Sequence, residues 1–143
     1  MAASVFDWTV RVYYEDTDAG GIVFYANYLK FFERARTEWL RACGVHQQAL
    51  KDEAGAMFVV KDAAISYHAP AQLDDVLKLT LGIEKLGRAS VQFVQQAWKG
   101  DVLLTSAQVK VGCVDSHSLR PRPLPDHIAA KMRASADHTS QSE

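Results

Sequence analysis

The chain has 143 residues, 48% of them hydrophobic and 23% charged, with a formal net charge of -1. These values are typical of one soluble globular domain, and the near-zero charge argues against nucleic acid as the main partner, because phosphate binding requires a basic surplus. No apolar run approaches the ~20 residues of a membrane-spanning helix, and the first residues do not resemble a signal peptide. We therefore expect a cytoplasmic protein without a transmembrane segment.

The first predicted elements are a strand and a long helix. Apolar and polar residues alternate over 8–14, which predicts a strand. From 28 to 43 the apolar residues recur at helical spacing and form a wide aromatic face, so we expect a central, deeply packed helix. Asn27 is the expected N-cap, and Gly44 stands where a left-handed glycine would end the helix.

Four strand-like runs follow without another long helix, over 57–67, 77–84, 90–98 and 102–114. This order predicts an α+β fold in which a five-stranded antiparallel sheet wraps around one long central helix. One helix covers only one face of such a sheet, so we expect a homodimer or homotetramer. A single domain is expected over 1–133, ending in a short helix from Asp126, with a disordered polar tail over 134–143.

An acidic, glycine-bearing segment separates the first strand from the helix. It contains Glu15, Asp16 and Asp18, followed by Gly20 and Gly21. Acyl-group hydrolysis needs a carboxylate that attacks or deprotonates water, and backbone N–H groups that hold a carbonyl oxygen. A helix start supplies such N–H groups. The alternative is a solvated acidic turn, and the spacing alone does not identify which acid would act.

The same segment carries a resemblance to a known family. Val12-Tyr13-Tyr14-Glu15-Asp16-Thr17-Asp18-Ala19-Gly20-Gly21, together with Phe32-Glu33-Arg34-Ala35-Arg36-Thr37-Glu38, resembles the 4-hydroxybenzoyl-CoA thioesterase family of hotdog-fold proteins and is similar to its Tol-Pal-associated acyl-CoA thioesterase branch. The resemblance runs from about Trp8 to Pro125. It implies a hotdog fold and hydrolysis of acyl-CoA to free acid and coenzyme A, without a metal or redox cofactor.

The resemblance also implies roles for particular residues. Asp18 matches the catalytic aspartate, as nucleophile or as general base, and the backbone N–H of Tyr25 matches the group that holds the thioester oxygen. Glu15 and Asp16 have no such role, so we expect them in a solvated loop. The Tol-Pal-associated branch commonly has histidine where this chain has Tyr25; a side-chain base at that position is therefore not expected, whereas the backbone role is unaffected.

Further residues are expected to bind substrate. Lys85, Arg88 and Ser90 surround a predicted turn where family members contact the nucleotide of coenzyme A, although a basic surface hairpin would look the same. Asn27 is expected to contact substrate at the helix start. The histidines lack metal-ligand spacing, so no metal is predicted, and Cys43 and Cys113 are expected to be small buried hydrophobes.

Two other functions remain open at this stage. A hotdog hydratase or dehydratase favours a catalytic histidine, and the acidic segment has none beside it. A non-catalytic scaffold that binds an acyl-carrier protein or an envelope-associated protein would need no catalytic group at all. Release of free thiol from acyl-CoA distinguishes the scaffold from the thioesterase.

Overall fold

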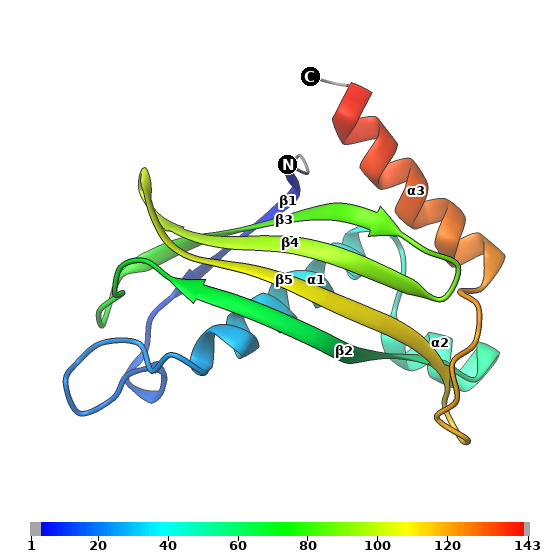
Figure 1. Cartoon of the computed structure of the whole chain (residues 1–143), viewed down its shortest axis with the longest axis horizontal. Coiled ribbons are helices and arrows are strands. Elements are labelled where there is room, and N and C mark those ends of the chain that lie inside the picture. The colour runs from blue at the N-terminus through cyan, green and yellow to red at the C-terminus, as the bar shows by residue number, and fades with distance from the viewer. Residues whose placement is uncertain (1–3, 142–143) are drawn as a thin grey trace.

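The structure, a computed structural model, describes residues 4–141, with side chains through residue 134. Within these residues, three α-helices accompany one five-stranded sheet: α1 (Asn27–Ala42), α2 (Gln47–Ala54) and α3 (Asp126–Gln141). The strands are β1 (Ser4–Arg11), β2 (Ala56–Tyr67), β3 (Val76–Leu86), β4 (Ser90–Lys99) and β5 (Val102–Asp115). All pairings are antiparallel, in the order β1-β3-β4-β5-β2 (Figure 1). The predicted α+β sheet around a long helix is confirmed.

Helix α1 packs its aromatic face into the core against β1 and β3. Phe31 and Phe32 are fully buried and Trp39 is 1% exposed, because apolar residues at helical spacing share one face. Gly44 has φ 82° and donates its N–H to the Arg41 carbonyl (2.9 Å). The left-handed glycine after the helix is therefore confirmed.

Several predicted boundaries differ from the structure. The first strand ends at Arg11, because Tyr14–Asp16 forms a 3-10 turn. The N-cap of α1 is Ala26 with helical backbone, so the prediction of Asn27 as N-cap is wrong. Helix α2 was not predicted, since it buries only Leu50 and its sequence is largely polar. The backbone of α3 stays helical to Gln141, beyond the short helix expected, and 142–143 lie outside the described residues.

Strand β2 forms an open edge of the sheet. Val60 pairs with Val111 of β5, and Ile65 pairs with Ala107. Val111 and Ala107 are buried, and paired residues point to the same face of a sheet, so Val60 and Ile65 lie on its inner face. Val60 nevertheless stays 52% exposed and Tyr67 47% exposed, because α1 packs over the β1 and β3 side. The inner face of this strand is therefore covered near Ala56 and Phe58, where α2 packs against it, and is largely uncovered from Val60 to Tyr67 within one chain.

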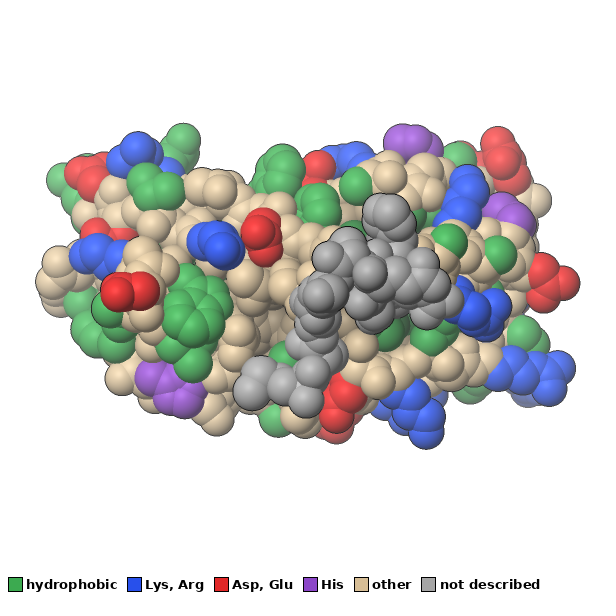
Figure 2. Space-filling view, turned by 90° about the horizontal axis from the view of Figure 1, so that it is seen from above, with side chains coloured by type: hydrophobic (Ala, Val, Ile, Leu, Met, Phe, Trp, Pro, Cys, Tyr) green, Lys and Arg blue, Asp and Glu red, His purple; other side chains and the backbone are tan. Residues whose placement is uncertain are grey.

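The surface and the remaining sequence features agree with a globular domain. Figure 2 shows one face on which acidic and basic side chains are interspersed rather than separated by sign. Within the part of the chain that the structure describes, no helix has the length and apolar character to cross a membrane. Cys113 is buried and Cys43 half-buried, as expected for small apolar side chains, and burial raises the pKa of the Cys113 thiol.

Candidate active site

Asp18 lies in a tight turn between β1 and α1. The Asp18 N–H donates to the Ile22 carbonyl (2.9 Å), and the Gly21 N–H donates to the Asp18 carbonyl (3.0 Å). Gly21 has φ 78°, a left-handed conformation that other residues adopt only with strain. Thr17 and Val23 form an isolated antiparallel bridge across the base of the turn. The segment therefore folds back on itself and presents Asp18 at its tip.

The carboxylate of Asp18 is exposed and held by the backbone. Oδ1 accepts a hydrogen bond from the Gly20 N–H at 2.8 Å. A Cβ at Gly20 would lie 3.2 Å from the same oxygen, so a larger residue would crowd the carboxylate. This single bond fixes the direction of the side chain and leaves its other oxygen open to solvent or substrate.

The backbone N–H of Tyr25 is available as a donor. Among the described residues it has no hydrogen-bond acceptor, and it lies just before α1, where the helix leaves N–H groups unpaired and carries a partial positive charge. The Tyr25 carbonyl accepts a hydrogen bond from the Tyr67 hydroxyl (3.0 Å). This contact from the end of β2 fixes the peptide at the helix start.

Asp16 differs from the solvated residue that we expected. It is 4% exposed, and its two carboxylate oxygens accept hydrogen bonds from Asn27 Nδ2 and the Tyr13 N–H, each at 2.9 Å. Its carbonyl also accepts from the Phe24 N–H (3.0 Å). The solvated-loop prediction is therefore wrong for Asp16 but correct for Glu15, which is exposed. Asp16 ties the turn to α1.

Asn27 and Asp16 are eleven residues apart in the chain, so no local pattern could have revealed their contact. The Asn27 side chain is 6% exposed and already donates to Asp16. The structure thus gives it a positioning role for the turn. A substrate contact by Asn27 stays a prediction.

Aromatic side chains surround the helix start. The rings of Tyr25 and Tyr28 lie 6.0 Å and 5.9 Å from that of Tyr67. Tyr28 is buried, and the polar neighbour of its hydroxyl is the side chain of Thr105. Desolvation raises the pKa of both Tyr28 and Tyr67, so these phenols stay neutral. The sequence did not single out Tyr67, because its contact with Tyr25 joins distant segments.

Lys85, Arg88 and Ser90 lie at the other end of the sheet. The Asp18 turn adjoins the start of β3, since the Val23 N–H donates to the Ala71 carbonyl (2.8 Å). The three predicted contacts for coenzyme A surround the turn that follows β3. An 11-residue strand separates the two places, which corresponds to roughly 30 Å. One chain therefore does not bring them together.

Fold and site together define the class of protein. A family model described as the thioesterase-like superfamily matches residues 12–132, and the chain belongs to this superfamily. The chain is similar to the acyl-CoA thioester hydrolase YbgC of Escherichia coli, with 46% identity over 134 residues that cover 93% of this chain and 99% of that protein.

Other relatives agree with this family. The acyl-CoA thioesterase YbgC of Haemophilus influenzae is 46% identical over 130 residues, which cover 91% of this chain and 96% of that protein. A solved structure of a probable thioesterase from Bartonella henselae has 35% sequence identity and a TM-score of 0.78, covering 83% of this chain and 98% of that one. The predicted hotdog thioesterase fold is confirmed.

Proposed function

We propose that this protein hydrolyses the thioester of acyl-CoA to free acid and coenzyme A. The observation that carries the proposal is the pairing of an exposed, backbone-held carboxylate at Asp18 with the unoccupied N–H of Tyr25 at the start of α1. These are the two groups that thioester hydrolysis requires. The similarity to proteins named acyl-CoA thioester hydrolase supports the same reaction.

In this mechanism the thioester oxygen accepts a hydrogen bond from the Tyr25 N–H, and the carbonyl carbon becomes more electrophilic. Asp18 then acts in one of two ways. As general base it takes a proton from water, whose oxygen forms the new bond to carbon as the carbon–sulfur bond breaks. As nucleophile it forms an anhydride with the acyl group, which water then cleaves. In both routes the sulfur leaves as thiolate and takes up a proton, and no metal or redox cofactor is needed.

We propose that the functional unit is a homodimer or homotetramer. The open edge of β2 offers unpaired backbone groups and uncovered apolar side chains such as Val60, and pairing with a second copy would satisfy both. Asp18 and the basic turn at Lys85, Arg88 and Ser90 are separated within one chain. With a second copy present, one acyl-CoA could bind its phosphates at the basic turn of one chain and place its thioester at Asp18 of the other chain.

The finer assignments are also proposals. The sequence resemblance favours the Tol-Pal-associated branch of the 4-hydroxybenzoyl-CoA thioesterase family, a cytoplasmic location, and an acyl-carrier or envelope-associated protein as a further partner. Tyr25 replaces the histidine common in that branch, so the proposed mechanism uses only the backbone of this residue. Light scattering that finds only monomer at micromolar concentration would contradict the oligomer.

The test compares two conservative variants in the same acidic segment. Asp18→Asn keeps the shape of the side chain but removes its charge, so kcat should fall by about two to four orders of magnitude, while Glu15→Gln should retain full activity. Thiol release from short, long and aromatic acyl-CoAs is followed colorimetrically, and thermal melting confirms folding. Undiminished turnover by the Asp18→Asn variant would contradict the proposed site. If the native protein releases no thiol from any of the substrates, a non-catalytic scaffold is favoured.

A further inference from the structure

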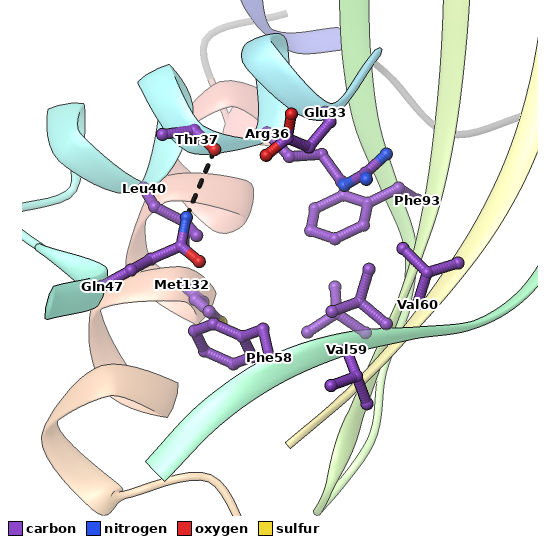
Figure 3. Close-up of a pocket in the computed structure, with 12 residues that line it drawn as sticks. Glu33, Arg36, Thr37, Leu40, Gln47, Phe58, Val59, Val60, Phe93 and Met132 are labelled. Carbon is purple, nitrogen blue, oxygen red and sulfur yellow. Dashed lines mark hydrogen bonds between the residues drawn. The ribbon is translucent and has the colours of Figure 1, made fainter. Parts of the chain in front are cut away.

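A cavity of about 110 Å³ lies between α1, α2, α3 and the inner face of the sheet (Figure 3). Most of its wall is apolar, formed by Leu40, Phe58, Val91, Phe93, Val111 and Met132. Because a dry apolar cavity of about 150 Å³ accommodates benzene, this volume suits roughly four to five non-hydrogen atoms. That is the size of the end of an acyl chain.

Two charged side chains, Arg36 and Glu33, also line this mostly apolar space. Arg36 extends from α1 toward Phe93 (Figure 3), and its Nη1 donates to Gln95 Oε1 at 2.9 Å. Gln95 is fully buried, and its Nε2 donates to the Phe32 carbonyl (3.0 Å). The amide of Gln95 is therefore fixed in orientation, and it fixes the guanidinium in turn.

Arg36 has donors to spare and no bound carboxylate. A guanidinium carries five N–H donors, and Gln95 accepts one of them. Glu33 on the same helix is exposed and forms no ion pair with Arg36 among the described residues. Desolvation lowers the pKa of Arg36, partly offset by the charge of Glu33. Because a half-buried cation without a hydrogen-bonded anion is costly, the unused donors of Arg36 are suited to a ligand that brings a carboxylate.

The cation also lies within reach of the reaction centre. Gln95 of β4 pairs with Ala107 of β5, and Tyr67 of β2 pairs with Thr105 of β5. Ala107 and Thr105 are two residues apart, which is about 7 Å along the strand, and β4 and β2 lie about 10 Å apart on either side of β5. Tyr67 in turn contacts Tyr25. An acyl chain of medium length with its carbonyl at Tyr25 would therefore carry its far end to Arg36.

We infer that this cavity binds the far end of the acyl group and that Arg36 selects acyl groups ending in a carboxylate, that is, the mono-CoA thioesters of dicarboxylic acids. The inference rests on the proposed function and specifies its substrate class. The carboxylate would accept charge-assisted hydrogen bonds from the unused guanidinium donors, while the last methylene groups of the acyl chain would contact the apolar wall beside Arg36, at Phe93. An alkanoyl group of the same length would leave Arg36 unpaired.

The test uses substrates matched in length that differ only at the far end, namely adipoyl-CoA against hexanoyl-CoA and suberoyl-CoA against octanoyl-CoA. The native protein should have a higher kcat/KM for the carboxylate-bearing member of each pair. Arg36→Met should lower kcat/KM for that member about 10- to 100-fold, while hydrolysis of the alkanoyl member stays equal or rises. Retained alkanoyl hydrolysis demonstrates that the variant is folded.

A second variant and a binding measurement make the result independent of Arg36→Met. Gln95→Glu places a carboxylate beside Arg36 and should abolish the preference by occupying the guanidinium. Calorimetric titration of the native protein with adipate and with hexanoate tests the cavity even if no acyl-CoA is hydrolysed, so failure of the reaction is distinguished from failure of the inference. Tighter binding of adipate supports the inference, and equal binding overturns it.

Two kinetic outcomes would also overturn it. If Arg36→Met lowers kcat/KM equally for both members of each pair, Arg36 has only a structural role. If the variant loses activity toward all substrates and dissociates in light scattering, the guanidinium instead bonds to a second copy of the chain. A native protein that prefers the alkanoyl member of each pair would exclude carboxylate selection directly.

Discussion

Asp16 is the buried member of the three carboxylates in the acidic segment, and its replacement is expected to destabilise the protein. Asp16→Asn retains one acceptor oxygen but turns an amide NH₂ toward the second of the two donors, Asn27 Nδ2 and the Tyr13 N–H. One charge-assisted hydrogen bond is lost and one donor stays unpaired in a site that is 4% exposed. Hydrogen bonds to charged groups contribute about 1.5–3 kcal/mol, so we expect a loss of about 2–4 kcal/mol in the free energy of unfolding.

Equilibrium unfolding in urea, at one fixed protein concentration, measures this loss. The midpoint should fall by about 1–2 M urea with little change in slope. Glu15→Gln is the matched control, because Glu15 is exposed one position away, and it should change the free energy of unfolding by less than about 0.5 kcal/mol. Since Asp16 ties the Asp18 turn to α1, kcat should also fall under conditions where Asp16→Asn is folded. An Asp16→Asn protein as stable as Glu15→Gln would refute the reasoning.

Two further predictions concern a positioning contact and pH. Tyr67→Phe keeps the aromatic contacts but loses the hydrogen bond to the Tyr25 carbonyl. In steady-state kinetics kcat should fall about three- to tenfold, with KM and the melting temperature nearly unchanged. An unaltered kcat would contradict this positioning role. The N–H groups of Ser118 and His117 lower the pKa of Asp115, so its contribution to stability is present above the unfolded value near 3.9 and is lost as pH falls through the lowered folded pKa. Asp115→Ala should therefore melt at a lower temperature than the native protein at pH 7, and the difference should shrink only as pH falls from about 4 through the lowered folded pKa; a difference independent of pH would count against the carboxylate.

Local sequence determined most of the secondary structure. Alternation over residues such as 77–84 and 102–114 requires strands with one buried face, and the helical spacing of Phe31, Phe32 and Trp39 requires an amphipathic helix. Gly44 could be assigned because a left-handed residue after a helix strongly favours glycine. These features were predictable since each depends on residues that are neighbours in the chain.

Tertiary structure decided the environment of the site. Glu15 and Asp16 are adjacent and chemically alike, yet only Asp16 is buried, because α1 brings Asn27 to it. Arg36 is likewise placed by a contact between distant segments, because its hydrogen bond to Gln95 joins a helix to a strand 59 residues away. Burial and hydrogen bonding between distant segments leave no local periodicity in the sequence. The chain's pattern therefore specified the elements and the acidic segment, whereas only the packed structure decided which carboxylate is structural and which cation faces the cavity.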